Sequence, residues 1–384
     1  MYIVAPAMPQ SLVRDAPGPA GVDVAALDTP CLVLDVDALE ANVARMARRA
    51  RDAGVALRPH AKTHKLVPVA RRQLDAGAAG LTVAKLGEAE WLAAHGVGDV
   101  LIAYPVWGPA KWERLARLAE SADIRVAADS LEVFEGISAA AARRGVTVRA
   151  RIEVDTGYGR CGVQSAEEAV RLAAAVDRLP GVGLVGLLSF AGQIYAARDD
   201  AAIAGAAADD AGRLLEVAAA VRDAGFAVPE ISVGSTPTAT RVGGLPAGIT
   251  EVRPGTYVFS DRDQVALGWG TLDDCALTAR ATVVSHPTPT RAIIDAGTKT
   301  LSSDAAQTAA GCGAIRGHPN WRLVSLNEEH GILEVGPGEA PIGTPVQIIP
   351  NHACGMLNLH DWVAACRGGV VVDWWPVEGR GLIR

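Results

Sequence analysis

The sequence RPHAKTHK at residues 58–65 is the stretch from which the rest of the chain can be interpreted. It follows a short apolar run at residues 55–57 and precedes a helical pattern that begins near Leu66. This places it on a loop that leaves a β-strand, where α/β folds carry their functional side chains. The stretch holds three cationic side chains and two imidazoles within eight residues. Its first lysine, Lys62, is therefore our first candidate for a reactive group.

The neighbours of Lys62 give its amine a character that covalent chemistry requires. Each nearby positive charge disfavours protonation, so Arg58, Lys65 and the two histidines are expected to lower the pKa of Lys62. A neutral amine at the mouth of a barrel can form a Schiff base with an aldehyde. The alternative is that the octapeptide is only a solvated basic loop.

Length and composition indicate a chain that folds without a partner. Its 384 residues are 49% hydrophobic and 21% charged, enough for two or three domains. The net charge is −7 and the basic residues are scattered, which argues against nucleic acid as a partner. No apolar stretch approaches the roughly 20 residues of a membrane span, and residues 1–21 do not resemble a signal peptide. Six cysteines without framework spacing predict reduced thiols and a cytoplasmic location.

Alternating strand and helix patterns predict a parallel α/β domain after a lead-in arm at residues 1–27. A first strand at residues 31–35 and a helix at residues 37–52 precede eight short apolar strands, near residues 55–59, 80–84, 99–104, 124–128, 147–154, 182–189, 230–233 and 250–259. Helical runs lie between several of them, at residues 110–122, 131–144, 166–178 and 201–224. Eight such strands predict a (β/α)8 TIM-type barrel. A doubly wound sheet is the alternative, although its usual Gly-x-Gly-x-x-Gly turn is missing after the first strand.

Beyond about residue 268 the pattern changes to strands separated by Gly and Pro. These strands are expected at residues 279–285, 291–294, 331–335, 346–349 and 369–374. They predict a second, mostly β domain at the C-terminal end of the chain.

Further polar turns follow the later barrel strands, whose C-terminal ends share one mouth. They are DTGYGRCG at residues 155–162, SFAGQIY at 189–195, SVGSTPT at 232–238 and RPGTY at 253–257. The third turn offers hydroxyl and backbone N–H groups that suit a phosphate, although such a turn is often no more than a turn. An amine, a phosphate cradle and an arginine at successive strand ends together predict a site for pyridoxal 5′-phosphate, with Lys62 as its Schiff-base partner.

A second group of candidate residues lies near the C-terminus, at His330 in EEHG and in PNHACG at residues 350–355. On an extended strand, residues two apart face the same side, so His352 and Cys354 could share one metal ion. Imidazole and thiolate favour zinc over magnesium, and two protein ligands leave positions open, as in a catalytic ion. The alternative is a buried cysteine beside a hydrogen-bonded histidine.

These motifs resemble the D-serine dehydratase / D-threonine aldolase family, fold-type III pyridoxal-phosphate enzymes related to alanine racemase. Five motifs agree in order and spacing, at residues 59–65, 155–162, 234–238, 253–257 and 352–354. The resemblance covers roughly residues 28–380. It implies a barrel domain at residues 31–267 and a β domain, made of residues 1–30 and 268–384, that carries the metal ligands. It also implies a homodimer with the metal beside the cofactor.

The resemblance implies roles for individual residues by their position in these motifs. The implied catalytic residues are Lys62, Gln193 and Tyr195, the last facing the substrate. The implied cofactor-binding residues are Lys62, His60, Gly234, Ser235, Thr236 and Tyr257, together with Arg160 near the phenolic oxygen of the cofactor. The implied ligands of a divalent metal ion, which is zinc or else manganese or cobalt, are His352 and Cys354.

Three details favour the dehydratase branch of this family. Aldolases usually present His-x-Asp as the metal pair, where this chain has His352-x-Cys354. They also tend to carry Gly-Thr-Gly at the phosphate turn, where residues 234–236 are Gly-Ser-Thr, and a histidine shortly after the position of Gly192, where this chain has Gln193. Because glutamine cannot take the proton of the substrate's β-hydroxyl, the chain is expected to eliminate water.

The expected substrate is a D-β-hydroxy-α-amino acid such as D-serine, D-threonine or D-3-hydroxyaspartate, and the products are a 2-keto acid and ammonia. The alternative is a D-threonine aldolase, which would give glycine and an aldehyde. An amino-acid racemase and a non-catalytic pyridoxal-phosphate carrier are the more distant alternatives.

Overall fold

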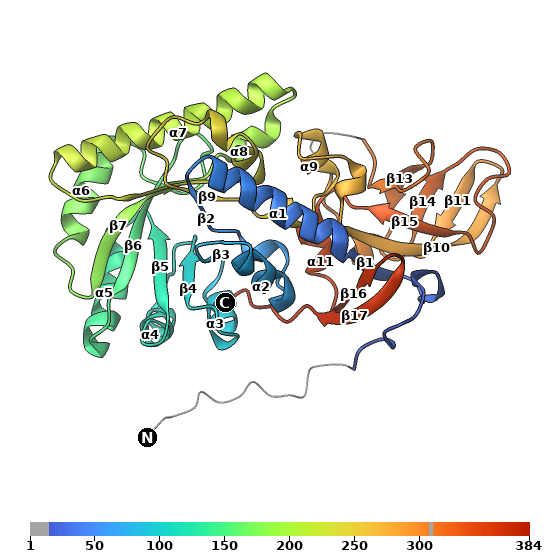
Figure 1. The fold of residues 1–384 in the computed structure, drawn as a ribbon, viewed down its shortest axis with the longest axis horizontal. Coiled ribbons are helices and arrows are strands. Elements are labelled where there is room, and N and C mark those ends of the chain that lie inside the picture. The colour runs from blue at the N-terminus through green and yellow to red at the C-terminus, as the bar shows by residue number, and fades with distance from the viewer. Residues whose placement is uncertain (1–14, 307–309) are drawn as a thin grey trace.

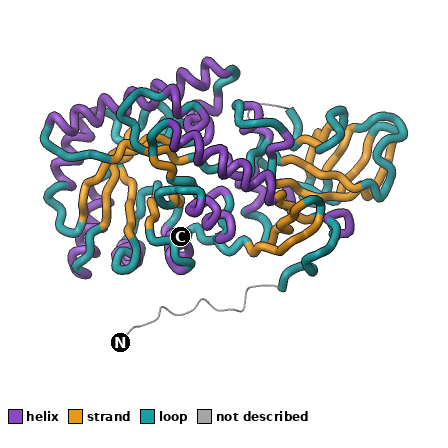
Figure 2. The backbone as a smooth tube through the Cα atoms, in the orientation of Figure 1, coloured by secondary structure: helices purple, strands orange, loops and turns teal. Residues whose placement is uncertain are grey.

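The computed structural model describes residues 15–306 and 310–384 and divides their strands between two sheets. Figures 1 and 2 show a helix-covered sheet on one side and a mostly β region on the other. The expected lead-in arm at residues 1–27 lies in part outside the described residues. None of the helices described is long and apolar enough to cross a membrane.

The helix-covered sheet confirms the predicted barrel. Its eight parallel strands have the order β2-β9-β8-β7-β6-β5-β4-β3. Their bounds are β2 (Ala56–Leu57), β3 (Leu81–Val83), β4 (Asp99–Ile102), β5 (Asp123–Ala128), β6 (Val148–Val154), β7 (Val182–Ser189), β8 (Glu230–Gly234) and β9 (Glu251–Arg253). The chain beyond β2 continues alongside β3, where His60 forms a parallel bridge with Thr82 and the Thr82 N–H donates to Pro59 O at 2.8 Å.

Helices lie against the outside of this sheet (Figure 1). They are α1 (Val36–Asp52), α2 (Val67–Asp75), α3 (Leu86–Ala94), α4 (Pro109–Leu118), α5 (Leu131–Arg144), α6 (Ala166–Val176), α7 (Asp200–Asp223) and the short α8 (Thr236–Thr240). The short helix α9 (Arg262–Ala266) lies instead beside the β region, where the Arg262 N–H donates to Pro350 O at 3.1 Å. The first shows why these segments are helical. Asp35 caps α1 by accepting the Ala38 N–H at 3.0 Å, and Leu39, Val43 and Met46 form its buried stripe.

The strand β1 (Cys31–Asp35) does not join the barrel, although we placed its residues at the start of that domain. It pairs antiparallel with β10 (Leu277–Thr288) and parallel with β16 (Trp362–Arg367). Its apolar run has the composition of a barrel strand, and a local pattern contains no information about which sheet completes the pairing.

The second sheet confirms the predicted β domain. Its order is β11-β14-β13-β12-β15-β10-β1-β16-β17, and β10 also pairs with β11, which closes six of these strands into a ring. The remaining strands are β11 (Arg291–Ile294), β12 (Ala314–Ile315), β13 (Arg322–Leu326), β14 (Gly331–Glu334), β15 (Pro345–Ile349) and β17 (Val370–Pro376). β12, β13 and β16 were not predicted from the sequence. The arm also contributes, since the Gly21 N–H donates to Val371 O at 2.8 Å.

Alternating charges cross the interior of the barrel near the starts of its strands. They form a closed ring in the order Arg58, Glu251, Arg151, Glu230, Arg125 and Asp99, and five of its six contacts measure 2.5–3.2 Å between nitrogen and oxygen. The three arginines are each at most 5% exposed. Because a buried charge is costly without a partner, the ring fixes the relative positions of five strands and of the segment that follows β2.

Removing one carboxylate from this charge ring should destabilise the fold. In Glu251→Gln, Arg58 and Arg151 lose their shared counter-ion, so we expect a loss of about 3–5 kcal/mol in the free energy of unfolding. Thermal unfolding of both proteins measures it. The matched control is Glu334→Gln, which breaks an exposed pair with Arg322 and should change stability by less than about 0.5 kcal/mol.

The stabilisation that the Glu251 carboxylate contributes should decrease at acidic pH. Burial alone would raise the pKa of Glu251, but Arg151 and Arg58 hold it far below its ordinary value. Its stabilisation is therefore complete above the unfolded pKa of about 4.3 and declines as the pH falls below that value. Equal stabilities of the wild type and Glu251→Gln at pH 7 would contradict the structural role of the charge ring.

Candidate functional site

Lys62 lies in a short 3-10 turn, η3 (Ala61–Thr63), beyond the C-terminal end of β2. A hydrogen bond fixes the start of the turn, where the His60 N–H donates to Pro254 O at 2.8 Å. After the turn, the backbone of Lys65 adopts a left-handed φ of 51°. Gly255 allows the close approach, because a Cβ there would lie 2.7 Å from Thr63 Oγ1. Residues 58–65, which we call the lysine loop, thus pack directly against the end of β9.

The pKa of Lys62 is lowered from its ordinary value, as predicted, and burial of the amine is the main cause. The Arg160 and Arg253 guanidinium groups lower it further, while the Cys354 side chain acts in the opposite direction. An amine in this environment loses its proton more easily than a lysine in water does.

The charged neighbours that we expected to lower this pKa are not its cause. Arg58 belongs to the charge ring, and Lys65 Nζ lies 3.3 Å from Glu88 Oε1. Burial lowers the pKa of His64 to about 4 and that of His60 well below its ordinary value, so both imidazoles are neutral. The sequence spacing does not reveal counter-ions that come from other strands and helices.

The residues predicted to bind phosphate converge beside this loop. Gly234 ends β8, and a Cβ there would lie 2.8 Å from Arg253 Nη2. Ser235 has a φ of 91° and caps α8, while Thr236 Oγ1 accepts the Tyr257 N–H at 3.1 Å. The first N–H groups of a helix have no acceptor within it. This tight turn, with its N–H, hydroxyl and phenol groups, fits the phosphate of pyridoxal 5′-phosphate.

Arg160 and Lys62 lie against the same aromatic ring, that of Phe190. The Phe190 centroid is 4.6 Å from the Arg160 guanidinium carbon and 6.0 Å from Lys62 Nζ. Arg160 is also 3.6 Å from Glu153, a buried carboxylate that the sequence analysis did not single out. The signal that could have found Glu153 is an acid inside an otherwise apolar strand.

The predicted metal pair lies beside the lysine loop, but not on an extended strand as we expected. His352 precedes the short helix α11 (Ala353–Leu357), and Cys354 lies in its first turn. The Cys354 sulfur is 3.4 Å from the hydroxyl of Thr63, the residue that follows Lys62. The residues around the pair form a turn that starts a helix, which a two-residue spacing cannot distinguish from a strand.

Carboxylates hold the metal pair in place. Asp304 Oδ2 lies 2.9 Å from His352 Nδ1, and the buried Asp261 accepts the Ala353 N–H at 3.0 Å. The neighbouring Cys354 raises the pKa of His352 to about 11, and His352 lowers the pKa of Cys354 although burial opposes this. In the part of the chain that the structure describes, no group of three or more His, Cys, Asp or Glu is arranged as a metal site.

Gln193 and Tyr195 both belong to η4 (Gly192–Ala196), the turn that follows β7. Burial raises the pKa of the Tyr195 phenol, and the charges of Asp261 and Cys354 add to this effect. Gln193 Oε1 is buried and has no hydrogen-bond partner among the described residues. His330, in contrast, is exposed in the turn before β14.

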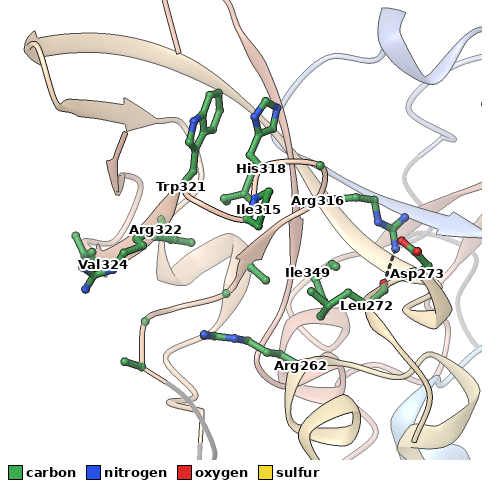
Figure 3. A pocket seen from close by; sticks show the side chains of 17 residues that line it. Arg262, Leu272, Asp273, Ile315, Arg316, His318, Trp321, Arg322, Val324 and Ile349 are labelled. Atoms are coloured by element: carbon green, nitrogen blue, oxygen red, sulfur yellow. Dashed lines mark hydrogen bonds between the residues drawn. The ribbon is translucent and has the colours of Figure 1, made fainter. Parts of the chain in front are cut away.

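A separate hollow of about 820 Å³ lies in the β domain (Figure 3). His318 stacks on Trp321 at one side of it, with 3.8 Å between ring centroids. Arg262, which lines the hollow, lies with its Nη1 3.3 Å from the side-chain oxygen of Asn351, the residue before His352. Lys62 and the phosphate turn do not line this hollow.

Comparison with known proteins agrees with this geometry. Residues 34–263 match the alanine racemase N-terminal domain family, and residues 276–366 match the putative serine dehydratase domain. The chain belongs to the family in which an alanine racemase N-terminal domain is followed by a serine dehydratase domain. It is 38% identical to the D-threonine aldolase of Arthrobacter sp, over 98% of this chain and 100% of that one. It is 36% identical to the D-threo-3-hydroxyaspartate dehydratase of Delftia sp. (strain HT23), over 92% and 98% of the two chains.

A solved structure extends this comparison to three dimensions. The D-threonine aldolase from Filomicrobium marinum superposes with a TM-score of 0.90 at 34% identity, and the match covers 96% of this chain and 100% of that one. Both the elimination and the aldol cleavage considered from the sequence are therefore represented among its relatives.

Proposed function

We propose that this protein is a pyridoxal-phosphate- and metal-dependent lyase that eliminates water from a D-β-hydroxy-α-amino acid. The substrate class is D-serine, D-threonine or D-3-hydroxyaspartate, and the products are a 2-keto acid and ammonia. The observation that carries the proposal is the 3.4 Å contact between Cys354 and Thr63, the residue beside Lys62. It puts a deprotonatable amine and two candidate metal ligands at one mouth of the barrel.

Each part of the site has a role in binding the cofactor. Lys62 would bind its aldehyde carbon and Arg160 would lie near its phenolic oxygen, while the phosphate would be held by Gly234, Ser235, Thr236 and Tyr257. His60 would line the same loop. Bound pyridoxal phosphate withdraws electrons from the substrate and so makes its α-hydrogen acidic.

Lys62 is the proposed base for the α-hydrogen. Its lowered pKa favours the unprotonated amine, which is the form that can accept a proton. Phe190, whose ring centroid is 6.0 Å from Lys62 Nζ, would form one wall of the site, and Tyr195 would face the substrate. Gln193 can donate a hydrogen bond to the substrate but cannot act as a base.

His352 and Cys354 are the proposed ligands of a divalent metal ion, with zinc the best match to imidazole plus thiolate and manganese or cobalt as alternatives. The ion would polarise the β-hydroxyl, which is otherwise a poor leaving group. Asp304 would orient His352 by accepting its Nδ1–H, which leaves Nε2 for the metal.

Retro-aldol cleavage is the second candidate reaction, and the 38% identity to a D-threonine aldolase over nearly the whole chain favours it. The side chain of Gln193 argues against it, because it lacks a basic atom.

We further propose that the protein is a homodimer. We propose a cytoplasmic location, which the six free cysteines support. We also propose two domains that correspond to the two sheets, with β1 in the β domain.

Product analysis with D-threonine tests the proposed reaction. The purified protein, supplied with pyridoxal phosphate and zinc, should release 2-oxobutyrate and ammonia in equal amounts. Chromatography of the keto acid and an enzymatic ammonia assay measure them. Glycine with acetaldehyde would instead establish the aldolase, and exchange of the α-hydrogen without either product pair would remove the lyase proposal.

Removal of the thiolate tests the metal site. Cys354→Ala should bind pyridoxal phosphate with unchanged absorbance but lose metal affinity, and its kcat should fall on the order of 100-fold. Cys312→Ala is the matched control, since Cys312 is a partly buried free cysteine outside the proposed site. Metal content and kcat equal to the wild type in Cys354→Ala would contradict the assignment of this ligand.

A further inference from the structure

Three buried side chains form a hydrogen-bonded chain behind the proposed phosphate turn. His64 Nε2 lies 3.1 Å from Gln73 Oε1, and Gln73 Nε2 donates to the Tyr257 hydroxyl at 3.0 Å. None of the three is more than 1% exposed. They come from the lysine loop, from α2 and from the turn after β9, so the chain connects the two parts of the site that would hold the cofactor.

A backbone group fixes the direction of every hydrogen bond in this chain. The Leu66 N–H donates to His64 Nδ1 at 3.1 Å, so Nδ1 is an acceptor and cannot carry a proton. A neutral imidazole then carries its proton on Nε2, which must donate to Gln73 Oε1. The amide nitrogen of Gln73 is left to face Tyr257, where it can only donate. The Tyr257 oxygen accepts this bond, and its own proton is free to be donated elsewhere.

We infer that Gln73 and His64 are positioning residues that make the Tyr257 hydroxyl a hydrogen-bond donor toward the phosphate of the cofactor. This inference rests on the proposed function, since the phosphate turn is its target. Tyr257 is tied to that turn through its N–H, which donates to Thr236 Oγ1 at 3.1 Å. Among the described residues, the Tyr257 hydroxyl has no hydrogen-bond partner other than Gln73.

The hydrogen-bond directions above require a neutral His64 imidazole, and the burial of His64 favours that state. Burial lowers the pKa of its imidazole to about 4, so it remains uncharged throughout the neutral range. A phosphate ester accepts hydrogen bonds and donates none when fully ionised. If the Tyr257 hydroxyl donated its proton to Gln73, only its lone pairs could face the phosphate and would oppose it; because the hydroxyl accepts from Gln73 instead, its proton is left for the phosphate.

A double-mutant cycle with two probe ligands tests this inference. Dissociation constants of pyridoxal 5′-phosphate and of pyridoxal, which lacks the phosphate, are measured for the wild type, Gln73→Met, Tyr257→Phe and the double variant. Methionine keeps the length of glutamine but removes its hydrogen bonds. We expect Gln73→Met to weaken pyridoxal phosphate binding about tenfold and pyridoxal binding less than about twofold. In the Tyr257→Phe background, Gln73→Met should have less than about a twofold effect.

Three results would overturn the inference. Equal weakening of both ligands by Gln73→Met would mean that Gln73 only supports packing. Additive effects of the two substitutions would mean that Gln73 does not act through Tyr257. If the wild type binds pyridoxal phosphate no more tightly than pyridoxal, the phosphate turn itself is misassigned, and the proposed function fails with the inference.

A measurement on the wild type keeps the inference testable if Gln73→Met does not fold. Nitrogen-15 NMR of the histidine rings, with His64 assigned by comparison with His64→Gln, should show the tautomer protonated on Nε2 at pH 7. A proton on Nδ1 of His64 would reverse the direction of the hydrogen bonds from His64 to Gln73 and from Gln73 to Tyr257, and would remove the inference.

Discussion

The closed ring of three arginines and three carboxylates inside the barrel is the constraint on which the rest of this structure depends. It joins strands that are far apart in the sequence, and each arginine needs two carboxylates from other strands to offset its burial. Arg58 lies four residues before Lys62, so the charge ring also fixes the start of the lysine loop. Above it, Arg253 donates to the Ser232 hydroxyl, which itself donates to Glu251 at 2.6 Å. The floor of the site and the core of the barrel are therefore continuous.

The proposed site is assembled from both sheets. The barrel supplies the amine and the phosphate turn, and the β domain supplies His352 and Cys354. Asp261 joins the two parts, because it caps α9 and also accepts the Ala353 N–H at the start of α11. Neither sheet carries a complete set of groups for the proposed reaction, which explains why the chain needs both. It also explains why a thiol of the β domain lies in contact with Thr63 of the lysine loop.

Much of this arrangement could be predicted from the sequence, because short apolar strands and helices with a regular apolar stripe leave a local signal. All eight barrel strands lie where expected. The partner of a strand leaves no such signal, so residues 31–35 were included in the bounds of the barrel domain although β1 pairs with strands of the other sheet. Nor did the spacing of His352 and Cys354 distinguish a helix start from a strand. The lowered pKa of Lys62 was predicted for the wrong reason, since the counter-ions of Arg58 and Lys65 come from distant segments. The charged residues inside apolar strands, such as Arg151, were the unused signal of the charge ring.

The central claim is that Lys62 binds pyridoxal phosphate, and borohydride reduction tests it most directly. The full-length protein is loaded with pyridoxal phosphate, reduced, digested and mapped by mass spectrometry. The account predicts one phosphopyridoxyl group on the peptide that contains Lys62, and none on the peptides that contain Lys85, Lys111 or Lys299. A label on another lysine, or an unlabelled Lys62 in a protein that has taken up the cofactor, would contradict it.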